Sequence, residues 1–347
     1  MMSVVIIPTI IFSVLVSALL TRLLIPWVLN ASLDRGITTV DAHKKNTPII
    51  AEAGGLAPLL AFIFTVLVII FSWAYLTQLG IYPFSQVLKN QTFEPLLAGV
   101  LSVVIAGLIG FLDDVFKIRW RDKILLGFLP AIPLMALKVG NSTINLGFLG
   151  VIDFTFAGLN LYSLIIIPLA INFAFNSFNM LAGFNGLETG NGVISLIGIL
   201  FISFLVNDPI VSLFTSALLG GFLVLLRFNW YPAKILVGDT GTLTLGTGIV
   251  VALIIGNMNR IAVGAFGLHF INFIMFLAYI ATKQTAKIAT IDENENIVAP
   301  CPYTVYWIIP YFYKNISEKK NVVILLFIHT VILALILLFS LPVFFPY

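Results

Sequence analysis

The sequence predicts an all-α integral membrane protein with about ten transmembrane helices, and two observations support that prediction. Of the 347 residues, 60% are hydrophobic and only 10% are charged, whereas soluble globular domains carry about 25% charged residues. The hydrophobic residues also gather into runs close to the roughly 20 residues that a spanning helix needs. So few charged side chains cannot cover a surface that faces water on all sides.

The apolar runs follow one another along the chain with short polar links between them. We place spans near residues 3–29, 55–76, 95–112, 122–140, 161–182, 190–206, 210–227, 240–257, 262–283 and 321–344. No Lys or Arg precedes Arg22, so the first run lacks the basic start of a signal peptide and we interpret it as a retained span. No internal repeat divides the chain, and residues 1–347 are expected to form a single multi-pass transmembrane domain.

Three further observations bound the structure outside the spans. Residues 141–160 alternate apolar and polar side chains, which predicts a small β-hairpin. The single Cys301 excludes an internal disulfide and a zinc site built from cysteines. The net charge of +3 is too small to favour nucleic-acid binding.

The basic residues predict the orientation, because loops on the cytoplasmic side of a membrane carry an excess of Lys and Arg. With the N-terminus outside, only Lys89, Lys138 and Arg260 of the 18 basic residues fall outside, which leaves 15 inside. All but three of the 15 acidic residues also fall inside. Because the positive-inside rule does not gather carboxylates, we expect an N-out, C-out protein with a cytoplasmic-face active site and an external hairpin.

The strongest candidate site is the link after the third span, Gly110-Phe-Leu-Asp113-Asp114-Val-Phe-Lys117-Ile-Arg119-Trp120-Arg121-Asp122-Lys123. Neighbouring residues on a helix point about 100° apart, so we expect Asp113 and Asp114 to have different partners. One interpretation is that nearby basic side chains only neutralise the pair. We favour a functional site, because four basic residues after two acids leave positive charge for an anion.

Other inside links add oxygen-bearing side chains. Asn179 lies in an apolar run where helix capping explains it poorly, and Asp239 either caps the eighth span or ligates a metal. Glu52 precedes Gly54 and Gly55, which permit either close approach to a ligand or helix packing. Lys44 and Lys45 are equally compatible with a solvated loop and with phosphate contact.

Three carboxylates and Asn179 on one face of the membrane suit one Mg²⁺ ion with retained waters, and the surplus Lys and Arg suit phosphates. Phosphoryl transfer depends mainly on positioning and charge neutralisation, and the chain has no P-loop sequence. The alternative class is a multi-span transporter, whose carboxylates would lie near the membrane midplane between inverted repeats. Acids confined to one face and the lack of a repeat argue against that class.

Three ordered motifs resemble those of the polyprenyl-phosphate N-acetylhexosamine-1-phosphate transferases, which are of the glycosyltransferase family 4 type. They are Gly110-Phe-Leu-Asp-Asp with Arg119-Trp-Arg-Asp-Lys123, Asn179-Met-Leu-Ala-Gly-Phe-Asn-Gly-Leu-Glu188, and Val237-Gly-Asp-Thr240. The most similar branch is the archaeal and eukaryotic UDP-GlcNAc–dolichyl-phosphate GlcNAc-1-phosphotransferase. The resemblance implies a phosphotransferase that makes GlcNAc-diphospho-dolichol and UMP from UDP-GlcNAc and dolichyl (polyprenyl) phosphate. This would be an initiating step of lipid-linked oligosaccharide synthesis for N-glycosylation, with Mg²⁺ or alternatively Mn²⁺ as cofactor.

The resemblance also implies which residues form the site. Asn179 and Asp239 correspond to metal ligands, and Asp113 and Asp114 correspond to the acidic pair that orients or deprotonates the lipid phosphate. The implied substrate-binding residues are Lys123, Lys117 and Arg121 toward phosphate, Asn185 and Glu52 toward the uridine, Trp120 toward the sugar and the lipid, and Glu188.

The last inside link departs from the eukaryotic pattern, in which arginines and a histidine follow Pro-Cys-Pro. Here the residues are Pro300-Cys301-Pro302-Tyr303. Another UDP-N-acetylhexosamine, used for a cell-surface polysaccharide, is therefore an alternative donor. The compact link favours the cell membrane of an archaeon or another prokaryote over the ER membrane of a eukaryote. The resemblance also implies contact with membrane lipids and a homodimer.

Overall fold

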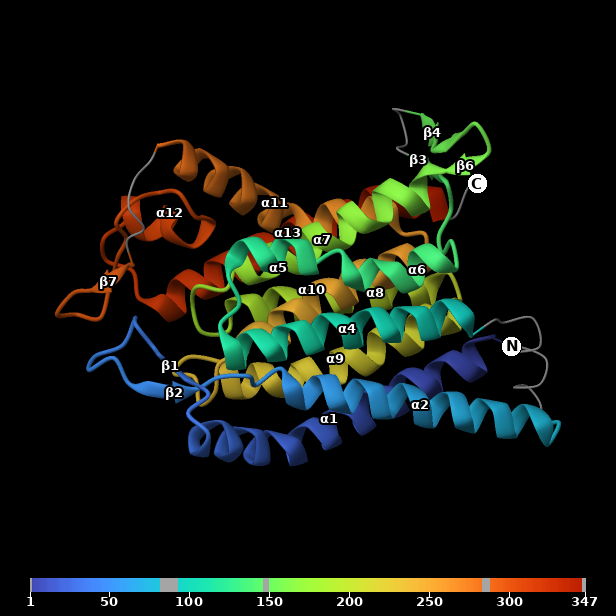
Figure 1. Cartoon of the computed structure of the whole chain (residues 1–347), viewed down its shortest axis with the longest axis horizontal. Coiled ribbons are helices and arrows are strands. Elements are labelled where there is room, and N and C mark those ends of the chain that lie inside the picture. Colours follow the sequence, from blue (N-terminus) through green and yellow to red (C-terminus); the bar gives the residue numbers. More distant parts are fainter. Residues whose placement is uncertain (1, 82–92, 146–149, 283–287, 345–347) are drawn as a thin grey trace.

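The computed structural model describes residues 2–81, 93–145, 150–282 and 288–344. Within these ranges, nine helices are long and apolar enough to cross a membrane, and they pack side by side as one bundle (Figure 1). They are α1 (Met2–Asp34), α2 (Leu56–Gln78), α4 (Glu94–Phe116), η3 (Tyr162–Ile166) continued by α7 (Ile167–Met180), α8 (Leu187–Leu205), α9 (Pro209–Asn229), α10 (Gly238–Ile255), α11 (Asn259–Ala281) and α13 (Glu318–Phe344). The expected all-α, multi-pass membrane class is confirmed.

The fourth expected span, near residues 122–140, is not one continuous helix. It is divided into α5 (Trp120–Leu126), the 3₁₀ turn η1 (Leu129–Ala131) and α6 (Ile132–Ala136). Pro130 and Pro133 begin the second and third pieces, and proline cannot donate the backbone hydrogen bond that a continuous helix needs. The pieces pack beside α4 and α7, so α5 can direct its charged side chains toward the end of α4.

Among the described residues, four antiparallel strand pairs and the short helix α12 (Val305–Phe312) occupy the two ends of the bundle. The strands are β1 (Thr38–Val40) with β2 (Ile49–Ala51), β3 (Thr143–Asn145) with β4 (Val151–Asp153), β5 (Thr155–Phe156) with β6 (Leu159–Asn160), and β7 (Thr290–Ile291) with β8 (Ile297–Val298). The third and fourth strands confirm the hairpin expected within residues 141–160.

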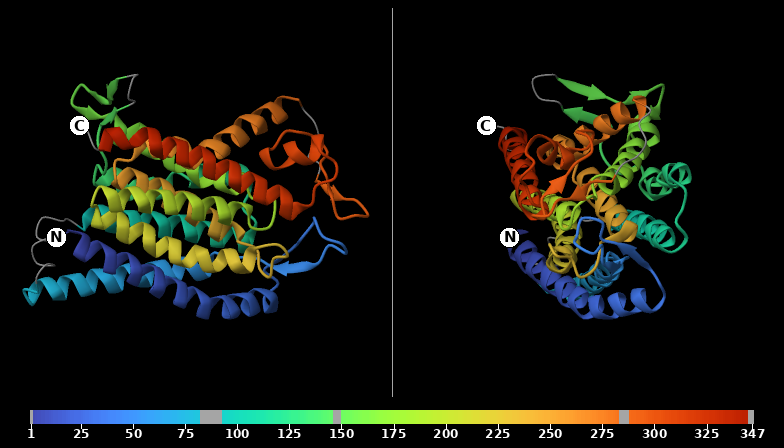
Figure 2. Two further views of the ribbon diagram at one scale, coloured as in Figure 1. Left: turned by 180° about the vertical axis from the view of Figure 1, so that it is seen from behind. Right: turned by 90° about the vertical axis from the view of Figure 1, so that its left-hand side faces the viewer.

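The connections divide into two groups at opposite ends of the helices (Figures 1 and 2). The pairs β1–β2 and β7–β8 lie at one end together with helix α12 (Val305–Phe312), and we call this the site end. The strands β3 to β6 and both chain termini lie at the other end, which we call the distal end. The two termini are therefore on the same side of the bundle, as the expected topology requires.

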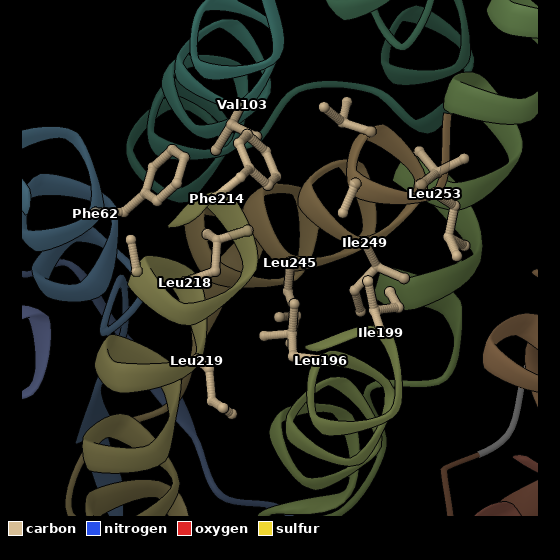
Figure 3. Packing of buried hydrophobic residues seen from close by; sticks show 14 of the residues in the cluster. Phe62, Val103, Leu196, Ile199, Phe214, Leu218, Leu219, Leu245, Ile249 and Leu253 are labelled. Atoms are coloured by element: carbon tan, nitrogen blue, oxygen red, sulfur yellow. The ribbon is translucent and has the colours of Figure 1, made fainter. Parts of the chain in front are cut away.

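Helix α10 lies in the centre of the bundle and is buried at every residue from Thr240 to Ile254. It packs against α4, α7, α8 and α9, and Figure 3 shows Leu245, Ile249 and Leu253 among side chains of the neighbouring helices. Close packing and small residues, rather than a hydrophobic driving force, hold helices together in lipid. A Cβ on Gly246 would lie 2.3 Å from the carbonyl oxygen of Ala174, so glycine lets α10 and α7 touch.

Candidate active site

The site is built where α4 ends and α10 begins, and Asp114 joins the two helices. Its Oδ1 accepts a hydrogen bond from the Asp239 amide at 2.7 Å. Its Oδ2 accepts from the Thr240 amide at 3.0 Å and from Thr240 Oγ1 at 2.5 Å. A carboxylate at a helix N-terminus satisfies free amides and interacts favourably with the helix dipole. Asp114 therefore fixes the first turn of α10, and both of its oxygens are occupied by that role.

Gly238 makes this junction sterically feasible. It has a φ of +68°, and a Cβ there would lie 2.6 Å from Asp114 Oδ2 and 2.7 Å from the Ala53 backbone nitrogen. Glycine is the residue that adopts this backbone conformation without a steric penalty. The turn Val237-Gly-Asp-Thr240 thus places Asp239 at the start of α10 with its carboxylate free for other partners.

Asp113 points toward a different set of partners, as its place on the helix predicts. Its Oδ1 accepts a hydrogen bond from the Ile118 amide at 2.6 Å, and its Oδ2 forms an ion pair with the Lys123 ammonium. Lys123 also donates to Asp239 Oδ2 at 2.8 Å. The Asn179 side-chain amide contacts Asp239 Oδ1. We call Asp113, Lys123, Asn179 and Asp239 the acidic cluster; its members come from α4, α5, α7 and α10.

The donor set of the acidic cluster fits a hard divalent cation. Two carboxylates and one side-chain amide offer the oxygen ligands that Mg²⁺ prefers, with water filling the remaining positions. Rotation of the Asn179 side-chain amide exchanges its oxygen and its nitrogen, so its oxygen can face a bound ion. Within the described ranges no group of three or more His, Cys, Asp or Glu side chains is arranged as a metal site, so an ion here would need the amide oxygen and solvent.

A polar pocket of about 250 Å³ opens beside the acidic cluster. Glu52, Asn179, Asn185, Glu188 and Asp239 all line it. The wall combines the β2–α2 link, the end of α7, the start of α8 and the start of α10. Side chains that are far apart in sequence, and were expected to bind either the metal or the substrate, therefore share one cavity.

The basic residues of the α4–α5 link and of α5 differ in their partners. Lys117 donates to Glu52 Oε2 at 2.6 Å. Burial alone would lower the pKa of Lys117, but the neighbouring Glu52 carboxylate outweighs it and leaves the pKa raised. Trp120 is 64% exposed, and the Arg121 guanidinium lies 5.3 Å from its ring. Neither these basic residues nor Trp120 lines the pocket. Lys117 and Lys123 are instead held by carboxylates at its edge.

The glycines before α2 serve helix packing. The Gly54 and Gly55 amides donate to the carbonyl oxygens of Leu236 and Val237 at 2.9 and 2.8 Å. Of the two interpretations of this pair, close backbone packing is therefore the one that the structure shows. It brings Glu52 to the same cavity as Asp239.

Several pocket residues were missed by the sequence interpretation. Asp41 and His43 line the pocket, and Thr240 binds Asp114. His43 packs edge-on against Phe184, with ring centroids 4.9 Å apart. The sequence offered only one acid, Asp41, and two basic residues, Lys44 and Lys45, in the short β1–β2 link. Such a link looks like an ordinary solvated loop, and only the fold shows that it reaches the start of α8.

Comparison with known proteins agrees with this geometry. The sequence profile described as glycosyl transferase family 4 matches residues 96–257, a range that contains the whole acidic cluster. A protein of Sulfolobus acidocaldarius is 32% identical over 245 residues, which cover 69% of each chain. The chain belongs to glycosyl transferase family 4.

Relatives of this family 4 protein include proteins named for two different activities. A Dictyostelium discoideum relative, 29% identical over 70% of this chain and 65% of its own, is named UDP-N-acetylglucosamine–dolichyl-phosphate N-acetylglucosaminephosphotransferase. The Sulfolobus relative is provisionally named for the same activity. A Clostridium botulinum phospho-N-acetylmuramoyl-pentapeptide-transferase is 33% identical, over 49% of this chain and 54% of its own. The dolichyl-phosphate relatives are thus matched over a longer part of this chain.

Proposed function

We propose that this family 4 protein transfers GlcNAc-1-phosphate from UDP-GlcNAc to dolichyl or another polyprenyl phosphate. The products are GlcNAc-diphospho-polyprenol and UMP, and the reaction begins the synthesis of a lipid-linked oligosaccharide for N-glycosylation. One observation carries the proposal most directly. The acidic cluster borders a polar pocket, which Asn179 and Asp239 line, at the end of a membrane-spanning bundle. A water-soluble nucleotide sugar and a lipid phosphate can both reach that end.

The chemistry requires an in-line displacement at phosphorus. An oxygen of the polyprenyl phosphate attacks the phosphorus that carries GlcNAc, a new P–O–P bond forms, and the bond to the bridging oxygen breaks as UMP leaves with that oxygen. Asp113 would accept a proton from the lipid phosphate once Lys123 has moved away from it, because Asp114 is fully used in capping α10. The Lys123 ammonium, released from its carboxylate partners, stabilises the negative charge that builds up on the leaving UMP.

The proposal includes a divalent cation, Mg²⁺ or alternatively Mn²⁺. Asp239 and Asn179 would hold it, with Asp113 supporting the site. When bound, such an ion neutralises the diphosphate and orients it for attack. Glu52, Asn185 and Glu188 would contact the nucleotide sugar from the pocket wall, while the exposed Trp120 and Arg121 would meet the lipid and its phosphate.

We also propose that the site end faces the cytoplasm and that the protein resides in the cell membrane of an archaeon or another prokaryote. The distribution of Lys and Arg supports that orientation. A homodimer is proposed from the family resemblance.

The direct test is an assay of purified protein with labelled UDP-GlcNAc and dolichyl phosphate, with Mg²⁺ and with EDTA. We expect labelled lipid and UMP in equal amounts, only when the metal is present. Asp113→Asn and Asp239→Asn should each lower the rate about 100-fold or more, whereas Asp153→Asn in the distal hairpin should not. Full activity in both site variants would refute the assignment. Parallel assays with other UDP-N-acetylhexosamines identify the sugar.

A further inference from the structure

A second charged cluster adjoins the pocket, where one of its members, Asp41, forms part of the wall, and the proposed chemistry does not use it. The Lys44 ammonium is 2.5 Å from Glu318 Oε2 and 3.3 Å from Asp41 Oδ1. The three side chains are only 9%, 2% and 7% exposed, respectively. Lys44 and Asp41 belong to the β1–β2 link, whereas Glu318 is the first residue of α13. This buried pair therefore connects the first link of the site end to the last long helix.

Both carboxylates of this cluster bind the same pocket residue. Glu318 Oε1 accepts a hydrogen bond from the Asn185 backbone N–H at 2.8 Å. Asp41 Oδ2 accepts one from the side-chain nitrogen, Asn185 Nδ2, at 3.0 Å. A carboxylate can only accept, so the Asn185 nitrogen must face Asp41. The Asn185 side-chain oxygen, Oδ1, is left without a hydrogen-bond partner in the described part of the chain. It is therefore the atom that Asn185 can offer to a ligand in the pocket.

The burial of this cluster indicates a role other than stability. Taking an ion pair out of water costs free energy that its mutual attraction often fails to recover. The neighbouring pair, Lys45 with Glu295, is 58% and 51% exposed and avoids that cost. Of two adjacent lysines, Lys45 thus forms an ordinary surface ion pair, whereas Lys44 is enclosed beside Asn185. The Lys44 ammonium also lies 4.4 Å from the Tyr231 ring centroid, which encloses it further.

We propose that Lys44 and Glu318 are positioning residues for Asn185. Glu318 holds the Asn185 backbone amide directly, and Lys44 fixes Asp41, which holds the side-chain nitrogen. The Asn185 side-chain oxygen is thereby turned to accept an N–H from the base of the nucleotide. This inference rests on the proposed function and adds a specificity rule to it. Uracil carries an N–H at ring position 3, whereas cytosine carries a lone pair there. With cytosine, the Asn185 side-chain oxygen and ring nitrogen 3 would both be acceptors and would face each other in a buried site. Such an unpaired contact costs about 1–3 kcal/mol, or roughly 10- to 100-fold in affinity.

The test measures binding of UMP and of CMP to the purified full-length protein, by calorimetry. We expect the wild-type protein to bind UMP about 10- to 100-fold more tightly than CMP. Lys44→Met and Glu318→Ala should bring that ratio close to one, with a raised KM for UDP-GlcNAc and a nearly unchanged kcat. Lys45→Met, which removes the exposed lysine of the adjacent pair, is the matched control and should retain the wild-type ratio.

A second variant keeps the inference testable if the buried lysine cannot be replaced without unfolding. Asp41→Asn has the same shape but can donate to Asn185, so the amide is free to turn and the preference for UMP should fall. Equal binding of UMP and CMP by the wild-type protein would overturn the inference, as would a preserved ratio in folded Asp41→Asn. Selective UMP binding without any lipid product would instead count against the proposed reaction alone.

Discussion

At the scale of single residues, Asp113 and Asp114 show how adjacent carboxylates acquire separate roles. The sequence could predict that they point apart, because helix geometry settles it. It could not predict that Asp114 would serve the α10 N-terminus, since this depends on a partner 126 residues away in sequence. Lys123 and Asn179 were expected at the site from motif resemblance, whereas Thr240, although it ends the third motif, was given no role before the structure showed its bond to Asp114.

The hydroxyl of Thr240 should matter more than that of another threonine on the same helix. Thr240→Val removes a 2.5 Å hydrogen bond to the Asp114 carboxylate, and we expect a loss of about 1.5–3 kcal/mol in the free energy of unfolding. Thr244→Val is the control, because Thr244 Oγ1 is buried without a hydrogen-bond partner in the described residues. Thermal melting in detergent compares the two variants, and equal melting temperatures would show that the bond from the Thr240 hydroxyl to Asp114 does not stabilise the fold.

The pH dependence of stability should have a contribution from His43. Burial first, and then the Lys44 charge, lower its pKa from 6.5 to about 4, although Asp41 opposes the shift. Below about pH 6.5 the unfolded chain binds the proton before the folded one, so stability falls as the pH falls toward 4. At pH 5.5 this should cost the wild type about 1 kcal/mol.

Melting of wild type and His43→Gln at pH 7.5 and pH 5.5 isolates this contribution. The variant should lose less stability than the wild type between the two values, because glutamine does not titrate. An equal loss in both proteins would show that His43 is not held neutral in the folded state.

At the scale of elements, the sequence located the long helices well and misjudged the broken one. Hydrophobic run length is a strong signal for a continuous span. The segment near residues 122–140 met that criterion, yet Pro130 and Pro133 divide it. The break is useful to the site, because α5 is free to turn Lys123 toward Asp113 and Asp239.

The junction between α4 and α10 should depend on Gly238. Gly238→Ala combines a strained positive φ with a collision against the Ala53 backbone, and we expect a cost of about 2–5 kcal/mol together with lost activity. Gly158→Ala is the matched control, since Gly158 has a φ of +78° and nothing within 4 Å of the added Cβ. Similar melting temperatures for the two variants would show that Asp114 and Ala53 can move aside.

At the scale of the whole molecule, the two ends of the bundle differ in what they carry. The site end has the pocket, the acidic cluster and the buried Lys44–Glu318 pair, whereas the distal end has the exposed strands β3 to β6. The distribution of charged residues along the sequence predicted this division, because the order of the spans alone decides which links share an end of the bundle. The contact between Lys44 and Glu318 could not be predicted, since 274 residues separate them and each resembles a solvated charge in its local sequence.

Labelling with a membrane-impermeant maleimide tests the orientation of the two ends. In a Cys301→Ala background, Phe156→Cys should react from outside intact cells, because Phe156 is a 70% exposed residue of the distal end. Lys45→Cys should react only after the membrane is permeabilised. The opposite pattern would reverse the proposed topology and place the pocket outside the cell.

The position of Glu318 has a consequence for how the protein is made. Helix α13 leaves the ribosome after every other described element, and its first residue is one of the two acids that hold Asn185. Until that helix has entered the membrane, Lys44 and Asp41 lack the partner that completes their cluster. A nascent chain with all earlier helices inserted would therefore still lack the Glu318 contacts, and the proposed nucleotide pocket would be complete only after α13 has been synthesised.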